Sequence, residues 1–124
     1  MKNRGTGYME IYMKPTQQLL RQLGANGSYA GFKYTVTSIC KTIQNPELII
    51  YICKGLYTEV ALQYEVNTGN VERNIRTVIE TIWKSGNREL LNKVCGKQLT
   101  ERPTNTFFID AVSQYIINSC EKQI

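Results

Sequence analysis

The segment that most constrains the fold lies between residues 54 and 83, where two helical patterns meet across a short polar turn. In the second pattern the apolar positions recur at helical spacing and fall in a single stripe, at about 100° per residue. These positions are Val71, Ile75, Val78, Ile79 and Ile82. On the same helical wheel Arg73, Thr77, Glu80 and Lys84 lie opposite the stripe, with Asn70 and Arg76 nearer the edges. The pattern predicts a helix that buries one face and leaves the other free to contact a ligand.

The turn before this helix carries capping residues. Asn67 and Thr68 have side-chain oxygens that can accept the unpaired N–H groups of a first helical turn, and Gly69 follows them. The segment upstream has apolar or small residues at helical spacing, namely Leu56, Val60, Ala61 and Tyr64. A bracing helix, a short turn and a helix with a free outer face are what a helix-turn-helix DNA reader needs. The same pair of amphipathic helices occurs in other all-α domains, so the spacing alone leaves both interpretations open.

A set of short motifs narrows the choice. It comprises Leu56-Tyr57, Ala61, Tyr64, Val71-Glu72-Arg73, Ile75-Arg76, Ile79-Glu80, Trp83, Ser85-Gly86-Asn87, Pro103-Thr104-Asn105 and Phe108-Ile109, with a weaker upstream match at residues 31–34. In this combination the chain resembles the C-terminal DNA-binding domain of the sporulation master response regulator of endospore-forming bacteria. The resemblance covers residues 15 to 124. It implies an all-α fold of about six helices with a central helix-turn-helix and no wing.

The resemblance also marks the residues expected to read DNA. In the family the Val-Glu-Arg run and the arginine after it lie on the recognition helix, which corresponds here to Glu72, Arg73 and Arg76. Arginine can form two hydrogen bonds with guanine O6 and N7, and a carboxylate can accept from cytosine N4. Such contacts suit the G·C-containing boxes of the family, which resemble TGTCGAA. Alternatively, Glu72 and Arg76 are four residues apart and simply form a surface ion pair.

The sequence departs from the family pattern at three positions. Asn70 stands where the family typically has arginine, and its amide favours adenine over guanine. Thr77 replaces a usual histidine. Phe107 lies three residues past Thr104, where the family has an acid, so it cannot complete a capping box and is a candidate interface residue. With Thr68 at the helix start, the predicted DNA-binding set is Thr68, Asn70, Glu72, Arg73, Arg76 and Thr77.

Composition agrees with a DNA-binding domain and not with an enzyme. The chain has 15 Lys and Arg against 10 Asp and Glu, a net charge of +5 that favours polyanionic partners. It has no histidine for general-base catalysis, and its only aspartate is Asp110. The glycines lack the Lys-Ser/Thr context of a phosphate-binding loop. We therefore expect a protein without enzymatic activity.

The cysteines and the apolar segments predict the environment. Cys40, Cys53, Cys95 and Cys120 are dispersed, and without histidine they do not form a usual zinc motif. We expect free thiols in a reducing compartment, no metal and no cofactor. The longest apolar run, residues 48–53, is too short to span a bilayer, and the N-terminus lacks the apolar core of a signal peptide. The expected location is the cytoplasm, without membrane contact.

Periodicity and helix-breaking residues predict the remaining helices and the N-terminal tail. We expect an N-terminal tail at residues 1–13, with an extended piece at 8–12, followed by one domain at residues 14–124. Further helices are expected from residue 15 or 16 to 23, from 30 to 44, from 88 to 94 and from 105 to 119. Asn45-Pro46 should end the second of these, and Gly86 is predicted as a left-handed cap after the recognition helix. The inward residues predicted are Leu19, Leu20, Leu23, Tyr34, Ile39, Ile43, Phe108, Val112, Tyr115, Ile116 and Ser119.

Together these features predict a sequence-specific transcription regulator that binds double-stranded DNA in the major groove. The family regulator carries a phosphoacceptor receiver in front of this domain, but residues 1–53 contain only two acids, Glu10 and Glu47. The chain is then either a domain excised from a longer regulator or a stand-alone relative. We favour the stand-alone relative, which aspartate phosphorylation would not switch. The resemblance implies self-association on tandem boxes through the last helices, and contact with the RNA polymerase sigma subunit after the recognition helix. The alternative is a protein-interaction module, such as an antagonist that pairs with a full-length regulator without reading DNA.

Overall fold

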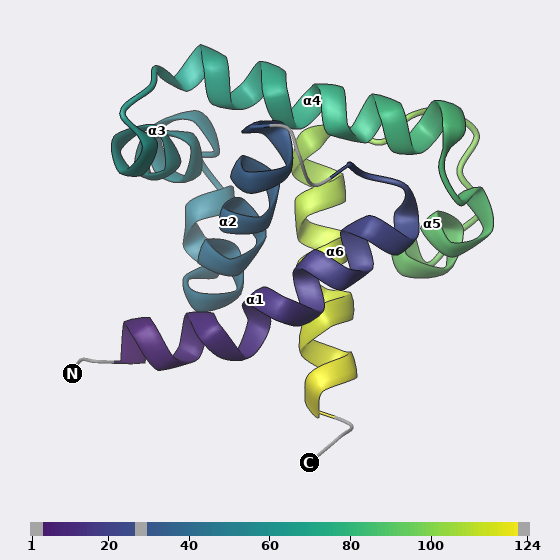
Figure 1. Ribbon diagram of the computed structural model, residues 1–124, viewed down its shortest axis with the longest axis horizontal. Coiled ribbons are helices and arrows are strands. Elements are labelled where there is room, and N and C mark those ends of the chain that lie inside the picture. The colour runs from purple at the N-terminus through teal and green to yellow at the C-terminus, as the bar shows by residue number, and fades with distance from the viewer. Residues whose placement is uncertain (1–3, 27–29, 122–124) are drawn as a thin grey trace.

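The computed structural model describes residues 4–26 and 30–121, and it confirms the all-α fold. Within these residues there are six α-helices and no strand (Figure 1). The helices are α1 (Arg4–Leu23), α2 (Ala30–Gln44), α3 (Thr58–Tyr64), α4 (Thr68–Ser85), α5 (Arg88–Cys95) and α6 (Asn105–Glu121). A 3-10 turn (Pro46–Ile49) and a π-helical turn (Cys53–Tyr57) connect α2 to α3. The predicted bounds of the second helix, 30 to 44, are confirmed.

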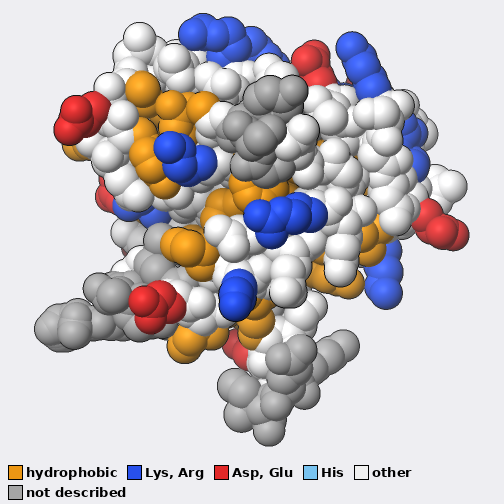
Figure 2. All heavy atoms as spheres, in the orientation of Figure 1, with side chains coloured by type: hydrophobic (Ala, Val, Ile, Leu, Met, Phe, Trp, Pro, Cys, Tyr) orange, Lys and Arg blue, Asp and Glu red, His pale blue; other side chains and the backbone are white. Residues whose placement is uncertain are grey.

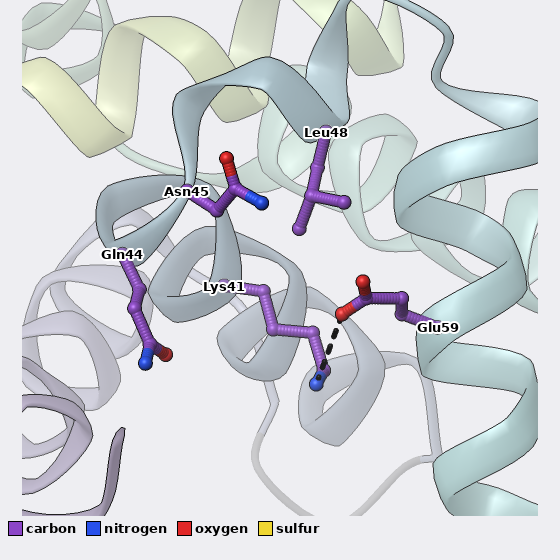
Figure 3. Close-up of a pocket in the computed structure, with 5 residues that line it drawn as sticks. All are labelled: Lys41, Gln44, Asn45, Leu48 and Glu59. Atoms are coloured by element: carbon purple, nitrogen blue, oxygen red, sulfur yellow. Dashed lines mark ion pairs between the residues drawn. The ribbon is translucent and has the colours of Figure 1, made fainter. Parts of the chain in front are cut away.

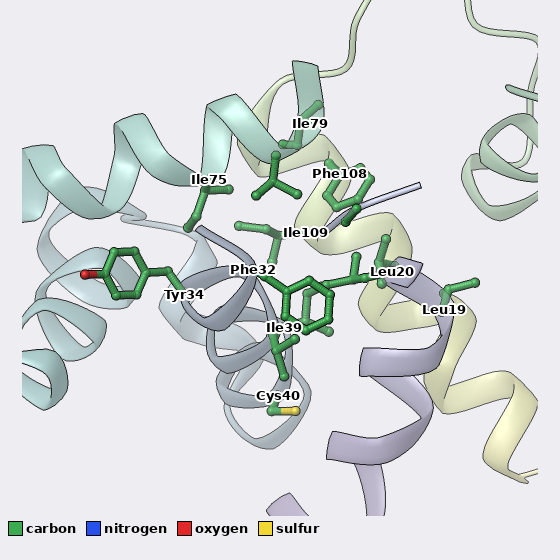
Figure 4. Packing of buried hydrophobic residues seen from close by; sticks show 14 of the residues in the cluster. Leu19, Leu20, Phe32, Tyr34, Ile39, Cys40, Ile75, Ile79, Phe108 and Ile109 are labelled. Carbon is green, nitrogen blue, oxygen red and sulfur yellow. The ribbon is translucent and has the colours of Figure 1, made fainter. Parts of the chain in front are cut away.

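Helix α2 forms the centre of the molecule and packs against α1, α4 and α6 (Figure 1). It is buried on nearly all sides because its only charged residues are Lys33 and Lys41. The core joins side chains from all six helices, and the close-up in Figure 4 shows part of it. They include Leu19 and Leu20 of α1, Phe32 and Ile39 of α2, Ile75 and Ile79 of α4, and Phe108 and Ile109 of α6. The central position of α2 therefore holds the predicted recognition helix, α4, in a fixed place.

Helices α2 and α4 approach each other closely at a glycine. A Cβ added to Gly31 would lie 2.7 Å from the Asn74 carbonyl oxygen and 2.9 Å from Val78 Cγ2. One turn later, Thr35 Oγ1 donates a 2.7 Å hydrogen bond to the Gly31 carbonyl, so this buried hydroxyl is satisfied within its own helix. The small residue at position 31 thus sets the separation between the centre of the fold and α4.

The ends of α1 and α4 also meet at glycines, and here the predicted role of Gly86 is wrong. Its backbone is extended (φ −93°, ψ −163°) and not left-handed. Glycine is needed because a Cβ would overlap the Leu23 carbonyl oxygen and lie 2.6 Å from that of Ile82. The Asn87 N–H donates to the Leu23 carbonyl at 3.0 Å, which fastens the two helix ends together. The glycines with positive φ are instead Gly24 (φ 115°), just after α1, and Gly96 (φ 74°), which caps α5.

The predicted N-terminal boundary needs correction. Helix α1 begins at Arg4, so the predicted start at residue 15 or 16 and the extended piece at residues 8–12 are wrong. Proline lacks an N–H group and is normally unfavourable inside a helix. Helix α1 continues through Pro15 because Tyr12 on one side of it and Leu19, Leu20 and Leu23 on the other are buried in the same core. The division of the chain into a tail at 1–13 and a domain at 14–124 stays a prediction, with residues 1–3 outside the described residues.

Helix α6 is longer than predicted and buries a slightly different face. It runs to Glu121, and Phe108, Val112 and Ile116 are buried as expected. Tyr115 and Ser119, predicted to point inward, are only half-buried. Ile109 and Ser113 are buried in addition, because α6 contacts α1, α2, α4 and α5 and so presents more than one narrow stripe. The partly open side of α6 includes Tyr115.

Candidate nucleic-acid interface

A three-residue turn joins α3 to α4. Glu65 takes a left-handed conformation (φ 58°, ψ 46°), and the Val66 N–H donates to the Ala61 carbonyl at 3.0 Å. Asn67 caps α4, since its Oδ1 accepts the Asn70 N–H at 2.7 Å. This confirms Asn67 as a cap residue and places Thr68 as the first residue of the helix. These hydrogen bonds fix the conformation of the turn, and the turn sets the orientation of α4 relative to the bracing helix α3.

Helix α4 crosses one end of the molecule, with its inner face on the core (Figure 1). The predicted stripe is confirmed, because all five of its apolar residues are buried: Val71, Ile75, Val78, Ile79 and Ile82. Of the predicted DNA-binding residues, Thr68, Arg73, Arg76 and Thr77 are exposed, while Asn70 and Glu72 are half-buried at the edges of the face. The structure therefore brings all six residues onto one helix, with the two arginines accessible to solvent.

The two arginines differ in their partners. Arg76 Nη1 pairs with Glu72 Oε2 at 2.9 Å, so the ion pair considered as an alternative exists in the structure. Arg73 has no ion-pair partner among the described residues. Both members of the Glu72–Arg76 pair are more than a third exposed, and such pairs are typically worth no more than about 1 kcal/mol. Breaking this pair to contact a ligand therefore costs little free energy. Arg73 can contact a ligand without breaking an ion pair.

Asn70 is more constrained than the sequence suggested. Asn74 Nδ2 donates both to the Asn70 carbonyl at 2.7 Å and to Asn70 Oδ1 at 2.9 Å. A two-bond contact with adenine needs this oxygen as an acceptor from N6, so Asn70 must share it or release it from Asn74. Thr77 Oγ1 donates to the Arg73 carbonyl at 3.0 Å, which leaves its hydroxyl oxygen as an acceptor.

Residues outside the helix-turn-helix hold α4 in place. Asn105, at the start of α6, uses its Nδ2 group to donate to the Tyr57 hydroxyl at 2.9 Å and to the Glu72 carbonyl at 3.1 Å. Burial raises the pKa of the Tyr57 phenol, although the hydrogen bond from Asn105 opposes the shift, so the phenol stays neutral. Arg102 Nη1 pairs with Glu80 Oε2 at 2.6 Å. The predicted site did not contain Tyr57, Arg102 or Asn105. The signals for Tyr57 and Asn105 were the motifs Leu56-Tyr57 and Pro103-Thr104-Asn105, and Arg102 had none.

Phe107 has the surroundings of a surface residue. Its N–H donates to Thr104 Oγ1 at 3.1 Å, so Thr104 caps α6 by itself, without the acid of a capping box. The Phe107 ring is 36% exposed, and Lys97 Nζ lies 5.1 Å from its centroid. This ring remains a candidate interface residue, since part of it faces solvent and part is covered by a lysine.

A polar pocket of about 470 Å³ lies behind the brace, between the end of α2 and α3 (Figure 3). Its lining includes Lys41, Gln44, Asn45 and Glu59, and Lys41 Nζ lies 3.6 Å from Glu59 Oε1. This ion pair links α2 to the bracing helix α3. The pocket is lined by α2, α3 and the turn between them, and not by α4.

Metal ligands, cysteine thiols and membrane-spanning helices would indicate other classes of site in the described part of the chain. No group of three or more Cys, Asp or Glu side chains there is arranged to hold a metal ion. The cysteines that were predicted to be free thiols are unpaired, and burial raises the pKa of Cys40 to about 11, so this thiol is protonated and unreactive at neutral pH. No described helix is long and apolar enough to cross a membrane.

A bracing helix, a short turn and a long helix with exposed arginines define a domain of the helix-turn-helix DNA-binding class. The family model described as sporulation initiation factor Spo0A C terminal matches residues 16–116, and the chain belongs to this family. The match confirms the resemblance found from the sequence motifs and begins one residue after its predicted start. The family is one of DNA-binding transcription regulators, the effector domains of sporulation response regulators, and not one of enzymes.

Proposed function

We propose that this domain reads a specific DNA sequence in the major groove with the outer face of α4, and so directs transcription regulation to particular sites. The observation that carries the proposal is the exposure of Arg73 and Arg76 on a helix whose other face is locked into the core. A fixed helix positions its side chains with the accuracy that base recognition requires. Arg73 is the leading base reader because it has no carboxylate partner among the described residues.

The other candidates take different roles in this proposal. Arg76 exchanges its ion pair with Glu72 for a guanine or a phosphate, and Glu72 is then free to accept from cytosine N4. Thr68, exposed at the start of α4, is suited to a phosphate, because the first N–H groups of a helix also favour anions. Asn70 and Thr77 contribute at the edges of the contact, with Asn70 limited by its bond to Asn74.

The proposal is tested by selecting binding sites from random duplexes and then measuring affinity for the selected box at several salt concentrations. We expect an enriched box that contains G·C pairs, because arginine and glutamate are the readers. We also expect log K to fall linearly with log salt, with a slope of about −0.9 for each phosphate neutralised. No enrichment, together with affinity that is flat between low and moderate salt, would contradict DNA reading by this domain.

We also propose that two copies bind neighbouring boxes. A single helix-turn-helix reads only a few base pairs, which is too little to find a site in a genome. The partly open side of α6, with Tyr115, and the adjacent Phe107 are the candidate contact between copies. We expect cooperative binding to two boxes whose centres lie about 10 base pairs apart, and loss of cooperativity when one box is shifted by about half a turn. The measurement is a titration of duplexes with varied spacing.

The spacing series has its own control, because each box is also tested alone. Moving a box by half a turn places it on the opposite face of the duplex without changing its sequence, so affinity for each single box should stay constant. Equal binding of the pair at every spacing would contradict contact between the copies and leave DNA reading intact.

A further partner is proposed from the family resemblance. The surface after α4 includes the exposed side chains Arg88, Lys93 and Lys97 on α5 and in the loop that follows it. This region of the chain resembles the surface through which members of the family contact the RNA polymerase sigma subunit. We propose the same partner here. The competing function, an interaction module that pairs with a full-length regulator, needs no exposed arginines on α4, and their presence favours DNA reading.

A further inference from the structure

A groove of about 350 Å³ lies between α1, α2 and the end of α3. We name it the α1–α2 groove. Its floor is formed by Met13, Phe32, Val36 and Tyr64, and Arg21 and Lys33 lie along its rim. Helix α1 is nearest the viewer in Figures 1 and 2, and on this face Lys and Arg side chains lie directly over hydrophobic surface. The groove combines an apolar floor with positive charge, and the helix-turn-helix does not account for either.

The floor of the groove is already formed in the free domain. Phe32 and Val36 are each only 4% exposed, and both are part of the core. The Tyr64 hydroxyl shares a 2.6 Å hydrogen bond with Thr37 Oγ1, and its ring lies 5.3 Å from that of Tyr34. The Tyr64 side chain is therefore held by the hydrogen bond of its hydroxyl and by the contact of its ring with Tyr34. A partner would meet a preformed surface and would not have to order it.

The charges on the rim contact aromatic rings of the domain but form no ion pair among the described residues. The Arg21 guanidinium lies 5.1 Å from the Phe32 centroid, and Lys33 Nζ lies 5.0 Å from the Tyr64 centroid. The ion pairs among the described residues involve other bases, Lys41, Arg76 and Arg102. No carboxylate lines the groove in the described part of the chain, and the nearest acid along α1, Glu10, comes about one turn before Met13. Two cations thus stand over aromatic rings without an acid to neutralise them.

We propose that the α1–α2 groove docks an acidic amphipathic helix of another protein. Apolar side chains of that helix would pack on the half-buried Met13 and Tyr64, while its carboxylates would pair with Arg21 and Lys33. The choice of an acidic partner rests on charge complementarity, which steers association and selects among partners. The choice of a polypeptide over nucleic acid rests on the apolar floor, since a phosphate backbone has no apolar groups to place there. Helix α2 also lies between the groove and α4 (Figure 1).

The experiment uses a labelled 16-residue helical peptide with leucines at i, i+3, i+4 and i+7 spacing and glutamates on both flanks. A matched peptide carries glutamine in place of every glutamate. Binding is followed by fluorescence anisotropy, and amide shifts of the labelled domain locate the contact. We expect saturable binding of the acidic peptide, shifts centred on α1 and α2, and affinity roughly tenfold lower for the glutamine peptide.

The variant that tests the rim is Arg21→Glu combined with Lys33→Glu. Both residues are exposed, so the change should not affect folding, and the acidic peptide should bind at least about tenfold more weakly. Lys54→Glu is the control, because Lys54 is an exposed base outside the groove and has no binding role in the proposed function. This control should bind the acidic peptide as the wild type does.

Several results would overturn the proposal. They are absence of saturable peptide binding, equal affinity for the two peptides, and an equal loss in the Lys54→Glu control. DNA affinity of the double variant is measured in parallel at about 0.15 M salt and should stay within about twofold of the wild type, because salt screens charges that do not touch the DNA. A large loss of DNA affinity with unchanged peptide binding would assign the rim to the DNA backbone. Loss of self-association in the double variant would assign the groove to a second copy of the chain.

Discussion

Gly86→Ala is expected to destabilise the domain by roughly 3 kcal/mol, because a side chain at this position has no room. The added Cβ would overlap the Leu23 carbonyl oxygen and lie 2.6 Å from that of Ile82, and neither backbone group can move by rotating a side chain. Relief requires α1 and α4 to separate at their ends, which breaks the bond from Asn87 N–H to the Leu23 carbonyl. Urea unfolding followed by circular dichroism measures the change.

The matched control is Gly69→Ala, in the first turn of α4. The nearest atom to its added Cβ is Asn67 Oδ1 at 3.4 Å, an ordinary contact. Alanine has the higher helix propensity, so this variant should equal or exceed the wild type in stability, by up to about 1 kcal/mol. If Gly86→Ala unfolds at the same urea concentration as Gly69→Ala, the close approach of α1 and α4 is not a stabilising feature of the fold.

The parts of the fold that could be predicted from the sequence depend on local signals. The C-terminal end of α2 follows from Asn45-Pro46, since proline disfavours a helical residue before it. The buried face of α4 follows from apolar residues at helical spacing, and its start follows from the side-chain oxygen of Asn67. In each case the residues that determine the structure are within a few positions of one another. Local chemistry was therefore sufficient for these elements.

The parts that could not be predicted depend on residues far apart in the chain. Nothing near Gly86 shows that Leu23 lies against it, and the left-handed cap predicted there was the ordinary local interpretation of such a glycine. The same holds for Asn105, which binds the Glu72 carbonyl across 33 positions. Helix α1 passes through Pro15 because of burial against the core, which outweighs the local preference to break. These contacts exist only once the helices have packed.

The candidate site divides in the same way. That Glu72, Arg73 and Arg76 share one side of a helix follows from spacing, and so does the alternative pair between Glu72 and Arg76, which the structure contains. No local signal pairs Glu80 with Arg102, because the two residues are 22 positions apart. Because Glu80 pairs with Arg102 and Glu72 pairs with Arg76, Arg73 and Lys84 are the charged residues of α4 without an ion-pair partner among the described residues. Base reading by any of them stays a proposal, and Arg73 is the residue on which it is best tested.

Arg73→Ala is expected to reduce affinity for the selected box by roughly 1–3 kcal/mol and affinity for random duplex by much less. The reason is that a two-bond contact from arginine to guanine depends on sequence, whereas phosphate contacts do not. Stability should change little, because the side chain is exposed and has no ion-pair partner among the described residues. Affinity is measured on the box and on random duplex at one salt concentration, with unfolding curves to verify the fold.

Arg76→Ala provides the comparison, and it is measured alone and with Glu72→Gln. Removing Arg76 leaves the Glu72 carboxylate unpaired next to DNA, so part of its effect should come from repulsion and should be recovered in the double variant. Arg73→Ala has no such partner, so Glu72→Gln should not restore its binding. If Arg73→Ala weakens the box and random duplex equally, Arg73 contacts phosphate. The base sequence would then have to be read by Asn70, Glu72 or Arg76. Glu72 and Arg76 are the stronger candidates, because Asn70 Oδ1 already accepts a hydrogen bond from Asn74.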